Sequence, residues 1–408
     1  MERVMGKKKN ILIVTPHFYP EDFKVNDIAF DLQKRGFGVS VVTCIPNYPQ
    51  GKFFSGYSLF KKRREAINGV SVYRVAVIPR GNGSGVMLGL NYLSYLITAT
   101  LTCLFLGLRH RYSHVFVHET SPVTVGLPAI LVKKIQRIPL FFWVLDLWPE
   151  SIVAASGLKN KFILNKIDRL VKFIYRSSNL ILISSKGFQK SILEKGDFRD
   201  KIVYFPNWAE DIFVKPIGNV ELPSFPKGFN VMFAGNIGEA QNFEVVMQAA
   251  LLTKRHKDIH YCIVGDGRKR SWVEEFVKRN ELEDTVHLYG RYPISHMPAF
   301  FDKADVMLLP LKDEPIFALT VPAKLQAYMA SSKAVVGLIA GEGANIISEA
   351  KCGFCVEPSN FEKLAEVILQ ASILSKDELK TMGNNGRIYY DSTFMKDSLL
   401  SKLEQLFL

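Results

Sequence analysis

The chain has 408 residues, of which 48% are hydrophobic and 22% charged, so it is globular and long enough for two or more domains. Its five scattered cysteines exclude a disulfide framework and fit a reducing cytosol. The net charge of +13 is uneven, because residues 1–200 carry +16 and residues 201–408 carry −3. A basic first half favours an anionic partner such as a lipid headgroup, a nucleic acid or a pyrophosphate. Nucleic acid is the least favoured, because the basic residues are not interleaved with aromatic side chains.

The first half alternates short apolar segments with helical patterns, as expected for a parallel sheet covered on both faces. We predict strands over residues 10–15, 38–43, 70–77, 114–118, 140–145 and 180–184. The predicted helices cover residues 26–35, 86–108, a stretch ending near residue 134, and 165–176.

The segment 86–108 has no charged residue and is followed by Arg109, His110 and Arg111. It is long enough to span a bilayer. It lies inside a domain, however, and a spanning helix would separate the strands on either side of it. We therefore expect a domain helix that turns one face to the membrane surface, with support from the basic cluster at residues 61–64.

The second half begins after a Pro/Gly-rich linker at residues 208–228. A second series of strands and helices starts at Phe229. Its further strands are predicted over residues 261–264, 286–289, 306–311 and 334–339, and its helices over 294–304, 360–374, 377–383 and 389–408. The sequence therefore predicts an α/β protein with two Rossmann-like domains.

The stretch after strand 306–311 is the first candidate site. Thr320 is a good N-terminal capping residue, Pro322 suits a first turn, and Lys324 adds a positive charge there. A helix start directly after a strand presents N–H groups that favour a phosphate. The alternative is an ordinary strand–loop–helix unit with a solvated lysine.

Further candidates follow other strands. Glycines stand at successive strand ends of the second domain, at Gly235, Gly265 and Gly290, where backbone can approach a nucleotide closely. In the first domain, Asp146 and Glu150 follow strand 140–145, at the edge of the sheet where ligands bind. These two carboxylates can also be read as ordinary helix-start residues favoured by the helix dipole.

Several motifs together resemble the retaining glycosyltransferases of family 4, which have the GT-B fold, and more narrowly the WbuB-like group of O-antigen and capsule N-acetyl-L-fucosamine transferases. The resemblance covers essentially the whole chain. It is carried by the segments 45–51, 78–85, 91–94, 146–151, 234–240 and 322–325, together with Pro20-Glu21.

The resemblance implies an acceptor domain over residues 1–207 and a nucleotide-sugar domain over 229–388, with helix 389–408 crossing back to the first domain. It implies catalytic roles for Asp146, Glu150 and Lys324, and acceptor contacts beside the loop of residues 15–23. The acceptor candidates there are His17, Tyr19 and Glu21. The implied donor contacts are Gly235, Asn236, Arg268, Gly290, Arg291, Leu319, Thr320, Val321 and Gln326.

The implied reaction moves a sugar such as N-acetyl-L-fucosamine from a UDP-sugar to a polyprenyl-diphosphate-linked saccharide, without metal or cofactor. It would occur on the cytoplasmic face of the bacterial inner membrane. One departure concerns the E-x7-E motif of the family, because its positions read Ala318 and Gln326 here. This departure keeps open a non-catalytic partner subunit, and a UDP-sugar 2-epimerase of the same fold is the alternative from another enzyme class.

Overall fold

The computed structural model describes residues 9–215, 218 and 220–408, which divide into two compact units. Unit 1 contains the chain up to Phe205 together with Leu399–Leu408, and unit 2 contains Pro206–Ser398. The predicted linker at 208–228 therefore belongs to unit 2. The return of the chain to unit 1 begins at Leu399, ten residues later than the predicted start of the crossing helix at 389.

Unit 1 is built on an eight-stranded sheet within the described residues, in the order β3-β4-β2-β1-β5-β6-β7-β8. Its strands are β1 (Asn10–Val14), β2 (Gly38–Cys44), β3 (Arg64–Ile67), β4 (Val70–Val75), β5 (His114–Glu119), β6 (Leu140–Val144), β7 (Leu180–Ile183) and β8 (Ile202–Tyr204). Every pairing is parallel except β3 with β4, a short edge hairpin that the sequence did not predict. The central strands β1 and β6 are almost wholly apolar because both faces of the sheet are covered.

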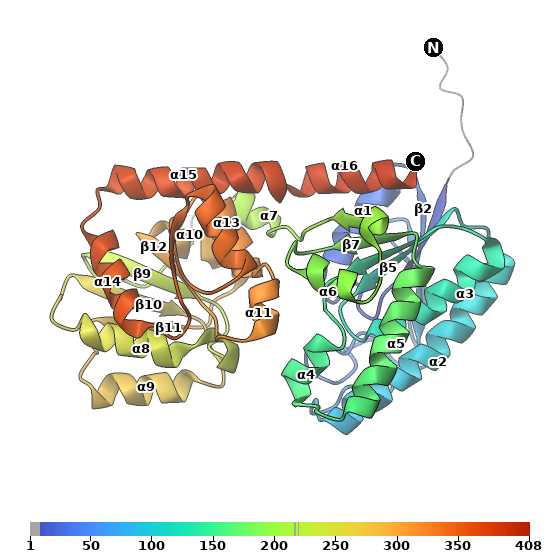
Figure 1. The fold of residues 1–408 in the computed structure, drawn as a ribbon, viewed down its shortest axis with the longest axis horizontal. Coiled ribbons are helices and arrows are strands. Elements are labelled where there is room, and N and C mark those ends of the chain that lie inside the picture. The colour runs from blue at the N-terminus through green and yellow to red at the C-terminus, as the bar shows by residue number, and fades with distance from the viewer. Residues whose placement is uncertain (1–8, 216–217, 219) are drawn as a thin grey trace, which may run out of the picture. The chain divides into compact units, whose positions relative to one another are not determined.

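The helices of unit 1 are α1 (Lys24–Lys34), α2 (Gly85–Arg109), α3 (Gly126–Gln136), α4 (Glu150–Ser156), α5 (Lys161–Ser177) and α6 (Phe188–Glu194). Helix α3 packs between α2 and α5, and the three helices lie together in Figure 1. Helix α16 (Lys396–Phe407) supplies Phe407, whose ring stacks on Phe141 at 5.2 Å. The C-terminal turn is thus part of the unit 1 core.

Unit 2 is built on a six-stranded parallel sheet within the described residues, in the order β11-β10-β9-β12-β13-β14. Its strands are β9 (Phe229–Ala234), β10 (Ile259–Val264), β11 (Val286–Gly290), β12 (Val306–Pro310), β13 (Val335–Leu338) and β14 (Gly353–Val356). Its helices are α7 (Asp211–Val214), α8 (Phe243–Leu252), α9 (Arg270–Arg279), α10 (Met297–Asp302), α11 (Pro315–Leu319), α12 (Ala323–Ala330), α13 (Glu342–Ala350), α14 (Phe361–Ser372) and α15 (Lys376–Thr393).

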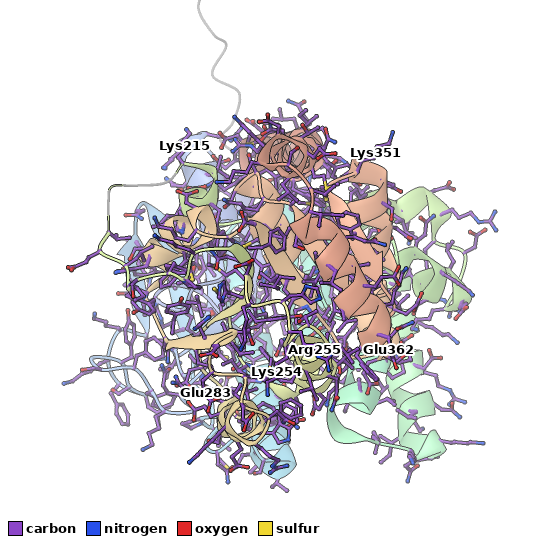
Figure 2. The ribbon with its side chains drawn as sticks, turned by 90° about the vertical axis from the view of Figure 1, so that its left-hand side faces the viewer. Lys215, Lys254, Arg255, Glu283, Lys351 and Glu362 are labelled. Carbon is purple, nitrogen blue, oxygen red and sulfur yellow. The ribbon has the colours of Figure 1, made fainter. Side chains whose placement is uncertain are left out.

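Alternate residues of the unit 2 strands face two separate apolar cores. Val231 and Phe233 of β9 face the core that contains α8 and α14, whereas Met232 faces the core that contains α10, α12 and α15. This period of two is what a sheet covered on both faces requires. The outer surface carries charges of both signs, and Figure 2 labels Lys254, Glu283 and Glu362 among them.

One predicted helix boundary in unit 2 is wrong. We expected a helix to end near Gly383 and another to begin at Tyr389, but α15 runs through both positions. A Cβ on Gly383 would lie 2.0 Å from the backbone oxygen of Ser332. The glycine therefore allows α15 to pack closely against the rest of the unit, and it does not end the helix.

Candidate functional site

The connections of the unit 2 sheet reverse direction at β9. The chain continues from β9 to β10 and β11 on one side, and β12, β13 and β14 lie on the other. In open α/β sheets such a reversal leaves a crevice beyond the carboxyl ends of the two strands, and ligands bind there. In unit 2 the crevice belongs to the segments that follow β9 and β12.

Backbone hydrogen bonds of glycines connect the strand ends on one side of this crevice. The Gly235 N–H donates to the oxygen of Val264 at 2.8 Å, and the Gly265 N–H donates to the oxygen of Gly290 at 2.8 Å. Gly235 and Gly265 have φ angles of +141° and +148°, and a Cβ on Gly265 would lie 1.8 Å from the Gly235 oxygen. Only glycine fits this backbone-to-backbone contact, as the sequence pattern indicated.

A pocket of about 430 Å³ lies at these strand ends within unit 2. This volume is in the range of pockets that hold small ligands. It is lined by Gly235, Asn236, Val264, Gly265, Asp266, Gly267, Arg291, Tyr292 and Met297. The predicted donor contacts Gly235, Asn236 and Arg291 are therefore brought together, whereas the exposed Arg268 and the partly buried Gly290 are not among the described residues that line the pocket.

Lys324, in the first turn of α12, lies against Gly235. Its Nζ is 4.1 Å from the centroid of the Phe233 ring, and a Cβ on Gly235 would lie 2.5 Å from its Cε. Within the described part of the chain no carboxylate lies within ion-pair distance of Lys324, and burial lowers its pKa to about 7. A bound anion would supply the missing negative charge and restore the charged form.

The start of α12 differs from the prediction. The predicted loop contains α11, and Pro322 is the N-cap of α12 instead of Thr320. Thr320 ends α11, because its N–H and its hydroxyl both donate to the oxygen of Phe317, at 3.2 and 3.1 Å. The Thr320 N–H is therefore already used within the protein, while the backbone roles expected of Leu319 and Val321 stay predictions.

Gln326 is not accessible to a ligand in this structure. Its side chain is 1% exposed, and its Nε2 donates to the oxygen of Asn207 at 2.6 Å. The donor contact expected of Gln326 is thus unsupported, and the residue instead holds the segment that enters unit 2. Its position on the inner side of α12 explains this role.

The unit 1 sheet reverses direction between β1 and β5, where a second crevice is expected. The Thr15 hydroxyl, after β1, lies 3.0 Å from Nδ1 of His118 in β5, and burial lowers the pKa of His118 to about 3. His118 is therefore neutral at physiological pH. These two residues join the carboxyl ends of the two strands.

The predicted acceptor residues form a polar network beside Thr15. Glu21 is buried, with Oε2 at 2.8 Å from Nδ1 of His17 and with Oε1 accepting the N–H groups of Asn47 and Tyr48 at 2.8 and 2.7 Å. His17 and Glu21 thus fix the loop after β1 to the loop after β2. Tyr19 is 46% exposed and remains accessible to a ligand.

Asp146, after β6, belongs to a hydrogen-bonded group that the sequence only partly indicated. Its carboxylate accepts from the Ser121 hydroxyl at 2.7 Å, and this hydroxyl accepts from Nε1 of Trp148 at 3.1 Å. Burial raises the pKa of Asp146, and its bond from Ser121 opposes that shift. A partly exposed carboxyl with a raised pKa suits exchange of a proton.

Glu119, at the end of β5, is a neighbour of Asp146 that sequence reasoning missed. Its fully buried carboxyl accepts the N–H groups of Leu145 and Asp146, at 3.3 and 3.2 Å. Burial first, and the charge of Asp146 second, raise the pKa of Glu119 well above its usual value. The sequence could have identified Glu119 as a candidate, because it stands at the end of a strand next to the switch point.

Glu150 has a different environment from Asp146. Its Oε1 accepts from the Ser191 hydroxyl at 2.6 Å and from the buried Lys195 ammonium at 2.7 Å. This pair joins α4 to α6. The geometry favours the structural reading of Glu150 over the catalytic one, and the catalytic role is left with Asp146.

Two family models match the chain in succession. Residues 24–208 match the glycosyl transferase 4-like domain, and residues 228–372 match glycosyl transferases group 1. The first match ends three residues beyond the boundary between unit 1 and unit 2, and the second match lies within unit 2.

Two relatives match this chain over most of their own length. The chain is 29% identical over 291 residues to the probable glycosyltransferase WbjE of Pseudomonas aeruginosa, covering 68% of this chain and 70% of that one. It is 26% identical over 389 residues to the putative colanic acid biosynthesis glycosyl transferase WcaI of Escherichia coli K12, covering 90% and 91%.

Solved structures share the fold at low identity. A glycosyltransferase from Rickettsia africae gives a TM-score of 0.70 at 16% identity, with 98% of both chains covered. HepE of Anabaena in complex with UDP gives a TM-score of 0.65 at 14% identity, with 98% of this chain and 99% of that one covered. Family models, relatives and fold agree: the chain carries a glycosyl transferase 4-like domain followed by a group 1 glycosyl transferase domain, and it is a glycosyltransferase of the GT-B fold.

Proposed function

We propose that this glycosyltransferase moves a sugar from a UDP-sugar to a polyprenyl-diphosphate-linked saccharide, with retention of the anomeric configuration, during synthesis of a bacterial surface polysaccharide. The observation that carries the donor side is Lys324, a half-buried lysine beside Gly235 at the unit 2 switch point, which has no acidic partner among the described residues. The complex of HepE with UDP supports the choice of nucleotide, and the name of WcaI supports a polysaccharide pathway.

The chemistry of the step assigns different tasks to the two units. The bond between the sugar C1 and the diphosphate oxygen breaks, and a bond from C1 to the acceptor oxygen forms. The departing diphosphate gains negative charge, which the Lys324 ammonium stabilises without reorganisation. The acceptor hydroxyl loses a proton, and we assign Asp146 to orient that hydroxyl or take its proton.

The proposed donor sugar is an N-acetylated deoxyhexosamine such as N-acetyl-L-fucosamine, which rests on the resemblance of the sequence motifs. The pocket supports only the nucleotide part of this proposal, through its glycines and through Asp266, Arg291 and Tyr292. The sugar is therefore the part of the proposal that a panel of donors tests most directly.

A membrane surface is part of the proposal because the acceptor is a lipid. Helix α2 is the one helix in the described residues that is long and apolar enough to cross a membrane. One side of it is buried against α3, β2 and β4 through residues such as Tyr95, Ala99 and Cys103. A stripe of its apolar side chains is at least one third exposed: Val86, Leu90, Leu93, Ile97, Leu101, Leu104, Phe105 and Leu108.

The spacing of this stripe matches one face of a helix lying in the plane of a membrane interface. The buried opposite side favours such an in-plane position over a true span. Basic residues accompany the stripe, with Arg109 at the end of α2, Arg111 beyond it and the cluster Lys61–Arg64 elsewhere in unit 1. We propose that this surface is the cytoplasmic face of the bacterial inner membrane, and the apolar stripe with its basic residues supports contact with a membrane surface.

The test is transfer of labelled sugar from each of a panel of UDP-sugars into the organic phase of a membrane lipid extract. The expected result is transfer from one donor that requires both protein and lipid. Conversion of a UDP-sugar without lipid would favour the 2-epimerase, and absence of UDP binding would favour the non-catalytic subunit. Either result would overturn the proposal.

A further inference from the structure

Arg80 is a half-buried cation that the reaction described above does not use. Its guanidinium carbon lies 5.3 Å from the ring centroid of Tyr48 and 5.9 Å from that of Tyr92, and one of its nitrogens donates to the Tyr92 hydroxyl at 3.2 Å. Within the described residues it has no carboxylate at ion-pair distance. The aromatic rings hold the side chain in place and leave its formal charge without an acidic counterpart.

The backbone around Arg80 is tied to two other segments of unit 1. The Arg80 N–H donates to Oδ1 of Asn47 at 3.4 Å, and the Gly81 N–H donates to the oxygen of Gly51 at 2.9 Å. Nδ2 of Asn91 in α2 donates to the oxygen of Ile78 at 2.6 Å. Three segments that the sequence motifs singled out separately thus form one preorganised frame.

Gly51 shows how tightly this frame is built. Its φ angle is +72°, and a Cβ there would lie 1.8 Å from the oxygen of Gly81. Only glycine permits this approach of two loops. The contact between the two loops therefore fixes the backbone that carries the Arg80 side chain.

Two other charged residues of unit 1, Glu21 and Arg74, are already satisfied by other partners. Glu21 accepts from two backbone N–H groups and contacts His17, and it is 3% exposed. Arg74 is buried and paired with Glu65. Within the described residues, neither Glu21 nor Glu65 neutralises Arg80, so its charge is left for a ligand.

The surroundings of Arg80 are apolar on one side. Ile78 and Tyr48 are 41% and 42% exposed, and Val86, at the beginning of the α2 stripe, is 74% exposed. A ligand that satisfies both features carries an anionic group and a hydrocarbon chain. A soluble anion would satisfy only the charge, and a neutral lipid only the apolar surface.

We propose that Arg80, in its frame of Tyr48 and Tyr92, binds the diphosphate of the lipid-linked acceptor, while the hydrocarbon chain runs toward the α2 stripe. The proposal rests on the proposed function, since it names the contact for the lipid half of that acceptor. The planar guanidinium can donate two parallel hydrogen bonds to phosphate oxygens, which an ammonium cannot do.

The experiment measures binding of the full chain to phosphatidylcholine vesicles by flotation. One vesicle set carries a polyprenyl diphosphate and the other carries phosphatidylglycerol at equal surface charge. The wild type should bind the diphosphate vesicles at least about tenfold more tightly, because two charge-assisted hydrogen bonds are added to the general attraction. Arg80→Gln should remove this preference and leave binding to phosphatidylglycerol within about twofold.

Arg109→Gln is the matched control, because it removes the same charge from an exposed arginine of α2 that also lies over an aromatic ring, that of Phe105. It should weaken binding to both vesicle types equally and keep the preference. Arg80→Lys, which keeps the charge, should still lose most of the preference. Equal thermal unfolding of the variants shows that the fold is intact.

The proposal is overturned if the wild type shows no preference for the diphosphate, if Arg80→Gln keeps the preference, or if Arg109→Gln removes it as well. Titration with UDP separates this result from the proposed function. A wild type that binds UDP but shows no vesicle preference contradicts the role of Arg80 alone. Absence of UDP binding contradicts the donor site, whatever the vesicles show.

Discussion

Lys324 gives the most informative perturbation, because its protonation should be coupled to binding of UDP. Burial lowers its pKa to about 7, so about half of the molecules carry the charged form at pH 7 and about a tenth at pH 8. A diphosphate next to Nζ favours the charged form and should return the pKa toward about 10. Binding should therefore take up about 0.5 proton at pH 7 and about 0.9 proton at pH 8.

The dissociation constant for UDP should follow the same linkage. It should be nearly constant below pH 7 and rise toward tenfold per pH unit above it, because each binding event must then recruit a proton. The useful range is pH 7 to 9, since the terminal phosphate of UDP loses its second proton near pH 6.

The assay is isothermal titration calorimetry with UDP in Hepes and in Tris, whose ionisation enthalpies differ. The difference in binding enthalpy between the buffers gives the number of protons taken up. Lys324→Met should abolish the uptake and the pH dependence, and it should weaken binding about 10- to 100-fold at pH 7.

Lys333→Met is the matched control, since Lys333 is also a partly buried lysine of unit 2 with a lowered pKa, and its Nζ donates to the oxygen of Ala304 at 3.3 Å. This variant should keep the proton uptake. Uptake that persists in Lys324→Met, or a UDP affinity that does not change between pH 7 and 9, would refute the assignment of Lys324 to the diphosphate.

Three further predictions separate functional from structural groups. Asp146→Asn should lower the transfer rate about 10²- to 10⁴-fold with little change in stability. Glu150→Gln should instead remove the charged partner of Lys195, lower the free energy of unfolding by about 1–3 kcal/mol and keep the transfer rate. The opposite pattern in urea unfolding and transfer assays would reverse the two assignments. Burial raises the pKa of Glu119 well above 4.5, its value in the unfolded chain, so the folded protein holds this proton more tightly and stability should fall as the pH rises above about 4.5. Glu119→Gln should remove this slope in pH-dependent urea unfolding, and an unchanged slope would show that Glu119 is not its source. Gln326→Ala should leave the Asn207 oxygen without its donor and lower the free energy of unfolding in urea by about 1–2 kcal/mol. The UDP dissociation constant should change less than about threefold. A large loss of UDP affinity at unchanged stability would restore the predicted donor contact.

The pH dependence of stability in Lys324→Met independently tests whether the pKa of Lys324 is lowered in the folded protein. A lysine whose folded pKa is lowered binds fewer protons in the folded state than in the unfolded state between pH 7 and about 10. The stability of the wild type should therefore rise with pH across that window. The methionine variant lacks the desolvated charge, so it should be more stable than the wild type at pH 6 and lose the slope, as expected where a functional group is held at a cost to stability.

The strands and the glycines at their ends could be predicted from the sequence because they depend on local patterns. Apolar runs such as Leu140–Val144 are what a sheet covered on both faces requires, and Gly235 and Gly265 occur where backbone must meet backbone. The length of α2 was also predicted to within a residue at each end. Such features need no knowledge of distant contacts.

The roles of single polar residues could not be predicted in the same way. Gln326 and Glu150 have the residue types expected of a site, but their partners Asn207 and Lys195 lie far away in the sequence. Glu119 was missed for the same reason, since only the fold brings its carboxyl to the N–H of Asp146. The predicted N-cap of α12 was wrong because α11 forms within the predicted loop, and Thr320 is the C-cap of α11.

The most direct test of the donor site is a crystal structure of the protein with UDP. We expect the diphosphate to lie over Gly235 with a phosphate oxygen about 3 Å from Nζ of Lys324, and the nucleoside to lie in the pocket lined by Arg291 and Tyr292. UDP bound elsewhere, with Lys324 still over the Phe233 ring and without contact to phosphate, would contradict it.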